Sequence, residues 1–390
     1  MTNYIKYVLK KNLPFHIISF VLVGWSFIIT ALSNNFFVEE RYASYSTDMH
    51  SNYPSSLFYI PVIVFMIMTL VIPFIAQSYR FRLASVDTYY QAPIKKGYLK
   101  YINSLCLYVP LVLSFTLLFF LGVLVIYMKA TMAPLPEDVS TEYVDIMYSR
   151  VNFHYEYYFL GYFLALLISP CMFFFSSFIV SKTNNMLNAI FTFILVFVAS
   201  MFVLGTITNF ISLLANIGDI TKYNRIEDLL GISPVYPVYT LCTWTEDAIL
   251  YGTLNNFFME GNKINAYELA RSILYVSVIG YTVFDFFWFK EPSGEFAGKP
   301  IGKDFFQNFF IHFAFGTFLF SIGTTVTMNA VIGPISEVVF VIIGYYLILS
   351  WLRRNFKPRL MDIILMSGNI SLFLVTFLGK LSILNYVTYY

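Results

Sequence analysis

Long runs of apolar residues alternate with polar connections along the whole chain. A helix needs about 20 largely apolar residues to cross a hydrocarbon core about 30 Å thick, and nine runs approach that length. The ninth is the weakest, because Asp362 and Asn369 interrupt it. The pattern predicts an all-α polytopic membrane protein with spans near residues 16–32, 57–77, 105–128, 157–180, 187–215, 266–289, 306–329, 335–352 and 360–379.

The composition supports this class. Of the 390 residues, 58% are hydrophobic and only 12% are charged, whereas soluble domains have about a quarter charged residues. The net charge of +2 supplies no strong field for nucleic acid. Two of the three cysteines, Cys106 and Cys171, fall inside apolar runs. That placement excludes a disulfide framework and a cysteine-based zinc site.

The connections differ in charge, and the difference predicts an orientation. With a cytoplasmic N-terminus, the inner connections contain sixteen basic and about four acidic residues. The outer connections contain six basic and about fourteen acidic residues. An excess of Lys and Arg marks the cytoplasmic side of a membrane. The predicted inner segments are 1–15, 78–104, 181–186, 290–304 and 353–359.

The segment before the first run predicts an interfacial elbow helix. Ile5, Val8 and Leu9 follow helical spacing, Lys6 lies on another side, and Pro14 then redirects the chain. Such an amphipathic pattern is typical of a helix that lies on the cytoplasmic leaflet. An ordinary positively charged leader would have the same composition. The first run is too long for the apolar core of a cleaved signal peptide, so we expect it to be retained.

Motifs for catalysis are missing, so we expect this chain not to be an enzyme. The stretch "GEFAGKP" has its glycines one residue too close for a phosphate loop, and Pro300 replaces the required hydroxyl. The four histidines are scattered among separate segments without metal-ligand spacing, and we expect each to be structural. No cofactor is expected in this chain.

The inner connection 78–104 has the pattern of a short amphipathic helix. Apolar side chains recur at i, i+4, i+7 and i+11, which is one helical face; they belong to Tyr79, Leu83, Val86 and Tyr90. Pro93 ends the helix, and Lys95, Lys96 and Lys100 follow. A partner protein could bind this helix, or the helix could rest on anionic headgroups. The pattern leaves both interpretations open.

Two short stretches resemble a known family. "DTYYQAPIKK", Asp87 to Lys96, is similar to the first inner loop of type-2 ABC exporter permeases, D-x-x-x-x-L-P-[IV]-[ST]-[RK]. "FKEPSGEFAGKPI", Phe289 to Ile301, resembles the S-E-x-A-G-K-P stretch of Ytr-type permeases of low-GC Gram-positive bacteria, although Gly294 stands where Ser is usual. The basic "RRNFKPR" at 353–359 is also similar to that subfamily. Longer Ytr-type permeases continue into a large domain outside the membrane; because this sequence ends at Tyr390, we expect outer loops or a partner to take the place of that domain.

The resemblance implies an architecture and a function. Residues 1–289 would form the elbow and a six-span permease core, 290–304 a cytoplasmic loop, and 305–390 two or three added spans. A separate ABC ATPase that uses ATP and Mg would bind the 79–100 loop, and a second permease copy, identical or related, would complete the exporter. The implied ATPase-coupling residues are Tyr79, Leu83, Asp87, Tyr90, Pro93, Ile94, Lys95 and Lys96, with Glu295, Gly298, Lys299 and Pro300 in the second loop.

The implied activity is outward movement of an amphipathic or hydrophobic substrate, such as a peptide, an antibiotic or a lipid-linked molecule. The setting would be the multi-pass cell membrane of a low-GC Gram-positive bacterium, with membrane lipids around it and antimicrobial peptide resistance as a role. A sensor of the antibiotic would look the same. The alternatives are a polytopic acyl or glycosyl transferase, which requires a polar cluster at one membrane face, and an ion-driven secondary transporter, which requires midplane ion ligands.

Charged residues within the apolar runs are candidates for a functional or anchoring role, because placing a charged side chain inside a bilayer is unfavourable in free energy. Glu268 and Arg271 are three residues apart and could pair on one helical face; with Glu337 they could line a substrate path or anchor at the interface. We expect Asp285 to reach the inner interface. Pro73 and Pro110 could bend the second and third spans. By analogy of position, 229–250 could cap the outer exit.

Overall fold

The structure is a computed structural model, and it describes the greater part of the chain. The described residues are 2–33, 37–41, 47–51, 56–81, 96–132, 155–214, 237–238, 240–242, 259–260, 263–264, 266–288, 305–324 and 332–388. The helices are α1 (Thr2–Lys11), α2 (Leu13–Ser33), α3 (Ser56–Ala76), the 3-10 turn η1 (Ser78–Phe81), α5 (Lys96–Met132), α7 (Tyr155–Ser181), α8 (Met186–Leu214), α11 (Ala266–Trp288), α12 (Phe305–Thr324), α13 (Ile332–Arg353) and α14 (Leu360–Thr388).

Each apolar run coincides with a helix over its described length, so the helical prediction is confirmed. Three helices in the described part are long and apolar enough to cross a membrane, at residues 98–125, 158–181 and 360–379. A fourth is added if α1 and α2, which are bent by 56°, count as one span. Four shorter apolar segments lie in α3, α8, α12 and α13. These features fit a helical membrane protein, and the total of nine spans stays a prediction.

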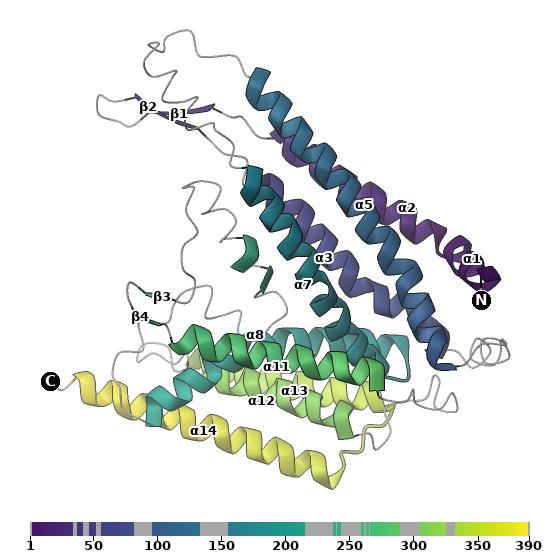
Figure 1. The fold of residues 1–390 in the computed structure, drawn as a ribbon. Coiled ribbons are helices and arrows are strands. Elements are labelled where there is room, and N and C mark those ends of the chain that lie inside the picture. Colours follow the sequence, from purple (N-terminus) through teal and green to yellow (C-terminus); the bar gives the residue numbers. More distant parts are fainter. Residues whose placement is uncertain are drawn as a thin grey trace. The chain divides into compact units, whose positions relative to one another are not determined.

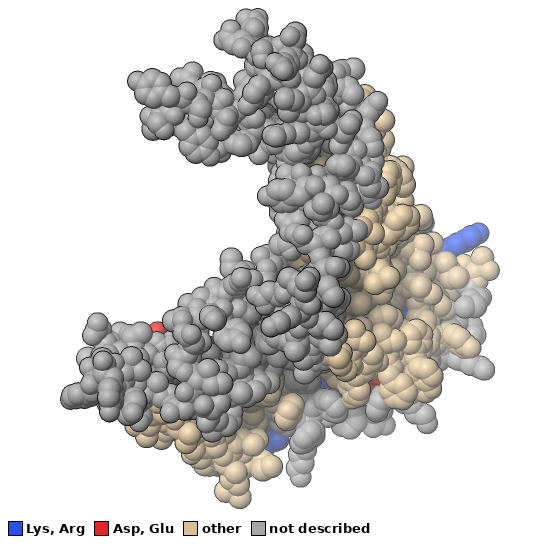
Figure 2. All heavy atoms as spheres, turned by 60° about the vertical axis from the view of Figure 1, so that its left-hand side comes forward, with Lys and Arg blue, Asp and Glu red and all other residues tan. Residues whose placement is uncertain are grey.

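Two short hairpins fall in predicted outer connections. Strand β1 (Phe37–Arg41) pairs antiparallel with β2 (Thr47–Ser51), and β3 (Met259–Glu260) pairs with β4 (Lys263–Ile264). The apolar pattern did not predict them. On the face drawn in Figure 2, the described surface is almost entirely uncharged, as helices in contact with hydrocarbon require.

Helix α1 is amphipathic as predicted, and its apolar face packs on protein. Val8 is 2% exposed and lies against Ile102 and Cys106 of α5. The hydroxyl of Tyr4 donates to Oδ1 of Asn103 at 2.9 Å. The lysines of α1 are exposed. The contacts attach α1 to the start of α5, and its position on a membrane surface stays a prediction.

The chain forms two compact units, the first of which comprises Met1–Ala76, Ile94–Phe174 and Pro237–Leu269. In this unit α2 and α5 lie side by side (Figure 1), and α3 packs on both. Its core is aromatic: the rings of Phe65 and Phe115 stack at 4.1 Å between centroids, and those of Phe119 and Tyr162 at 4.7 Å. A side chain at Gly122 would put its Cβ 2.6 Å from the Phe27 ring, so glycine permits the close approach of α2 and α5.

Prolines lie within three apolar helices, and one of them has a visible compensation. Pro170 in α7 has no N–H for the carbonyl of Leu166, and the hydroxyl of Ser169 donates to that oxygen at 3.1 Å. The hydroxyl of Tyr108 in α5 lies 2.5 Å from Oγ of Ser169. Because Ser169 donates its only hydroxyl proton to the carbonyl of Leu166, Tyr108 is the donor in this second hydrogen bond. Pro73 and Pro110 lie inside α3 and α5, and bending there stays a prediction.

The second unit comprises Gln77–Pro93, Phe175–Tyr236 and Ala270–Tyr390. Helix α12 is its centre, because α8, α13 and α14 all pack on it (Figure 1). Ile311, Phe315, Tyr345 and Leu349 form one buried cluster, and Leu319, Val338, Phe373 and Phe377 form another. These two units are defined by contacts between residues. The predicted division into 1–289, 290–304 and 305–390 is defined by membrane topology, so the units do not test it, and it stays a prediction.

Gly122→Val tests the close contact of α2 and α5. Overpacking a filled site costs about 1–3 kcal/mol, so the variant should melt at a lower temperature in mild detergent than the wild type. Gly280→Val in α11 is the matched control, since nothing lies within 4 Å of the added Cβ. Equal melting temperatures of the two variants would contradict the packing described here.

Candidate functional site

The predicted coupling loop enters the described structure only at its two ends. Tyr79 lies in η1, where Tyr79, Arg80 and Phe81 are all buried. The chain therefore leaves α3 through a 3-10 turn rather than directly into the predicted amphipathic helix. Lys96 is the first residue of α5, which begins nine residues before the predicted run, and Lys100 is buried within it. Leu83, Asp87, Tyr90, Pro93, Ile94 and Lys95 lie outside the described residues.

A buried arginine anchors the base of this loop. Arg80 is 7% exposed, and its guanidinium donates to Oε1 of Gln77 at 2.8 Å and to the carbonyl of Ser181 at 3.2 Å. Gln77 is fully buried, and its Nε2 donates to the hydroxyl of Ser177 at 2.9 Å. A planar guanidinium can serve several acceptors at fixed angles. The loop base is thereby attached to the C-terminal end of α7.

An ion pair between a half-buried lysine and a buried aspartate joins the same end of α7 to α11. Nζ of Lys182 lies 2.6 Å from Oδ1 of Asp285, and the hydroxyl of Ser181 lies 3.4 Å from the other oxygen. Asp285 is 2% exposed. The expectation that it reaches the inner interface stays a prediction; within the protein its carboxylate is covered and pairs with Lys182. Lys182 also lies over the Phe178 ring, at 5.5 Å.

Together these contacts form one cluster, which we call the loop anchor: Gln77, Arg80, Ser177, Ser181, Lys182 and Asp285. It gathers segments 77–81, 177–182 and 285, which are about 100 residues apart in sequence. The predicted topology puts all three at the same, cytoplasmic side. The loop base is held to the end of α7 by the hydrogen bonds of Gln77 and Arg80, and the end of α7 is held to α11 by the ion pair.

The other predicted site residues are less informative. Glu268 and Arg271 lie in α11, but their side chains are outside the described part, so their pairing is untested. Glu337 is exposed near the start of α13. Glu295, Gly298, Lys299 and Pro300 lie outside the described residues, as does most of the predicted outer cap at 229–250.

The sequence analysis missed a second buried polar group. Nε2 of His312 in α12 lies 3.2 Å from Oδ1 of Asp362 in α14, and its Nδ1 is hydrogen-bonded to the hydroxyl of Tyr345 in α13. All three residues are buried. Asn369 donates to the carbonyl of His312 at 3.1 Å. These contacts connect the three C-terminal helices through polar atoms.

Asp362 has a second role at the start of α14. Its Oδ2 accepts a hydrogen bond from the backbone N–H of Arg359 at 2.9 Å, which is the return contact of a capping box. The available signal in the sequence was the presence of His312, Asp362 and Asn369 within otherwise apolar runs. In such surroundings a polar side chain needs a partner. Among the described residues, no group of His, Cys, Asp and Glu could hold a metal ion.

Comparison with known proteins adds no relative: no family model matches the chain, and neither a curated protein nor a solved structure is similar to it. The resemblance to exporter permeases therefore rests on the short stretches quoted above.

Tyr345→Phe tests the contribution of the His312 group to stability. The change removes one hydroxyl and leaves a buried imidazole nitrogen without that hydrogen bond, which costs about 1–3 kcal/mol. Unfolding in mild detergent should occur at a lower temperature. Tyr281→Phe is the control, because Tyr281 is 44% exposed in α11. An equal effect of both substitutions would show that the buried chain of hydrogen bonds contributes nothing.

Proposed function

We propose that this chain is the permease subunit of a type-2 ABC exporter, in which a separate ATPase binds the 79–100 loop. The supporting observation is the loop anchor. It attaches the first residues of that loop to the end of α7 through a buried guanidinium, and an ion pair with a buried carboxylate joins that end of α7 to α11. A loop that only joined two helices would not need a charged group buried at its base.

The mechanism follows from this attachment. The ATPase dimer closes on ATP and displaces the loop, and Arg80 transmits the displacement to Ser181 and, through Lys182 and Asp285, to α11. Energetic coupling of this kind requires an element with two arrangements whose balance both sites affect. The helices bound to the loop anchor are that element in our proposal. The substrate is amphipathic or hydrophobic, and ATP and Mg bind to the partner subunit.

Orientation supports the same proposal. The predicted topology puts the basic connections and the loop anchor at the cytoplasmic side, where a soluble ATPase would bind. In this proposal the chain lies in the cell membrane with its N-terminus in the cytoplasm, and a second permease copy completes the transporter. A sensor that consumes ATP in response to an antibiotic would use the same contacts.

One observation favours a different function, an ion-driven carrier. His312 and Asp362 are buried ionisable residues between apolar helices, and such residues often form proton pathways. Their partners Tyr345 and Arg359 account for the pair structurally as well. Transport driven by a proton gradient without ATP would favour the carrier over the permease.

The test is copurification from cells that express the chain with its neighbouring genes. A nucleotide-binding subunit should be retained in mild detergent, and Asp87→Ala combined with Lys95→Ala and Lys96→Ala should reduce its retention. Arg80→Lys keeps the charge but loses the planar fork, so the ATPase should stay bound while substrate-stimulated ATP hydrolysis falls about 5-fold or more.

Lys10→Met removes the charge of an exposed lysine in α1. It is the control for the loss of charge in the triple alanine variant, and it should leave the retention of the nucleotide-binding subunit unchanged. Purification without any nucleotide-binding subunit would contradict the permease proposal. Full stimulation in Arg80→Lys would leave the partnership intact and would refute the role of the loop anchor.

A further inference from the structure

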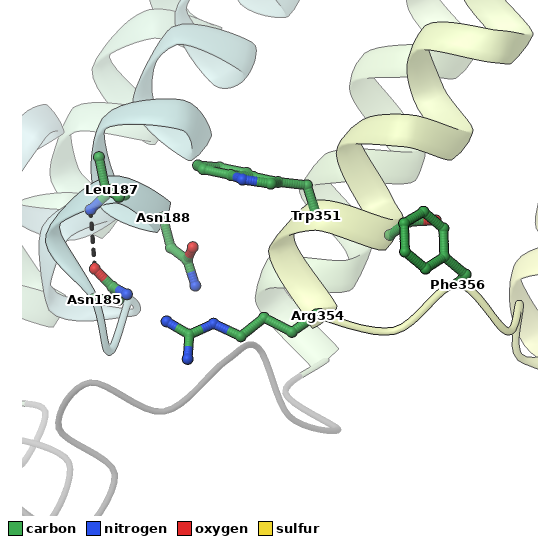
Figure 3. Close-up of a pocket in the computed structure, with 7 residues that line it drawn as sticks. Asn185, Leu187, Asn188, Trp351, Arg354 and Phe356 are labelled. Carbon is green, nitrogen blue, oxygen red and sulfur yellow. Dashed lines mark hydrogen bonds between the residues drawn. The ribbon is translucent and has the colours of Figure 1, made fainter.

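A cavity of about 330 Å³ lies between the beginning of α8 and the end of α13 in the second unit. Its lining combines one cation, two amides and an aromatic wall, supplied by Arg354, Asn185, Asn188, Trp351 and Phe356 (Figure 3). None of the described residues that line it is acidic. The predicted topology places both of these helix ends at the cytoplasmic side, at the level of the lipid headgroups.

The side chain of Asn188 presents its amide to the cavity. Asn188 is 5% exposed and makes no hydrogen bond with the described residues, yet its amide faces the cavity. The amide is the part of this mostly buried side chain that reaches the cavity, so a ligand there can form hydrogen bonds with it. Figure 3 shows Asn188 and Arg354 pointing toward each other across the cavity. The amide N–H groups and the guanidinium are donors, so the complementary ligand is an acceptor with negative charge.

The first turn of α8 adds to the same preference. The side chain of Asn185 caps this helix, since its Oδ1 accepts from the N–H of Leu187 at 3.1 Å and its carbonyl accepts from Ala189 at 2.9 Å. The positive end of the helix dipole lies there, and the amide nitrogen of Asn185 remains as a donor. Anions are favoured at such a position.

Arg354 adopts a left-handed backbone conformation that is unfavourable for residues other than glycine. After α13, Arg354 has a φ of 51°, and the bonds from Asn355 N to Ser350 O and from Arg354 N to Trp351 O form a Schellman motif. Glycine occupies this left-handed position in most proteins, because a Cβ is strained there. A residue with a Cβ therefore occupies this position at a conformational cost, and its side chain lines the cavity.

Aromatic and basic groups around the cavity indicate an interfacial ligand. Trp351 and Phe356 present large apolar surface beside the cation, and Trp is typical of the boundary between hydrocarbon and water. The exposed side chains of Lys357 and Arg359 follow directly in the chain. Basic pockets between membrane helices at the cytoplasmic side suit acidic lipid headgroups.

We propose that this cavity binds the phosphate of an anionic phospholipid from the cytoplasmic leaflet. Arg354 and the amides of Asn185 and Asn188 donate to the phosphate oxygens, and the glycerol and the beginning of the acyl chains lie on Trp351. Inorganic phosphate offers the same oxygens but has no apolar part to cover the indole. The site does not depend on an ATPase partner and holds equally for a permease or a carrier.

The test is the melting temperature of the full chain in neutral detergent with added phosphatidylglycerol, phosphatidylcholine or inorganic phosphate. Phosphatidylglycerol should raise the melting temperature by several degrees, because a ligand that binds only the folded state stabilises it. The other two additions should leave it nearly unchanged. Native mass spectrometry should show a phosphatidylglycerol molecule that survives delipidation.

Arg354→Gly is the decisive variant, because glycine suits the left-handed backbone and should keep or improve stability without lipid. It should lose both the thermal shift and the retained lipid, and Asn188→Leu should weaken both. Lys357→Gln, which removes a neighbouring cation outside the cavity lining, should keep them. Equal shifts with phosphatidylcholine, an equal shift with inorganic phosphate, or a full response in Arg354→Gly would overturn the proposal.

Discussion

Hydrocarbon can form no hydrogen bonds, and this constraint determines which polar groups the chain can place inside its apolar helices. Backbone groups are satisfied within the helices themselves. Where Pro170 interrupts that pattern in α7, the hydroxyl of Ser169 bonds to the carbonyl of Leu166, which the proline leaves without its usual donor. Charged side chains follow the same rule: Arg80 and Asp285 are buried only together with acceptors or a cation.

Two buried polar groups of the second unit each join three separate segments of the chain through side-chain atoms. The loop anchor connects the loop base, α7 and α11, whereas the His312 group connects α12, α13 and α14. Apolar helices can slide against one another at small cost, but a buried hydrogen-bonded group fixes their register. In our account the first group transmits force and the second keeps the C-terminal helices together.

Much of the fold could be predicted from the sequence, because apolar runs directly report helices. Even the weakest run, interrupted by Asp362 and Asn369, forms a helix long enough to cross a membrane. Partners could not be predicted, since Arg80 and Ser181 are about 100 residues apart and a pattern along the chain does not encode their contact. For the same reason the pairing of Asp285 with Lys182 was not predicted, and His312 was treated as a scattered structural residue although it contacts Asp362. The hairpin at 37–51 lies in a polar connection, where no apolar period marks its strands.

The central claim is that the connections 181–186 and 353–359 lie in the cytoplasm, since the loop anchor and the proposed lipid cavity both require it. Labelling of single cysteines in intact cells with a membrane-impermeant maleimide tests it most directly, in a background with Cys106, Cys171 and Cys242 replaced by alanine. The account predicts that Asn185→Cys and Asn355→Cys react only after the membrane is permeabilised, whereas Thr47→Cys in β2 reacts at once. Labelling of either inner position in intact cells would contradict the account.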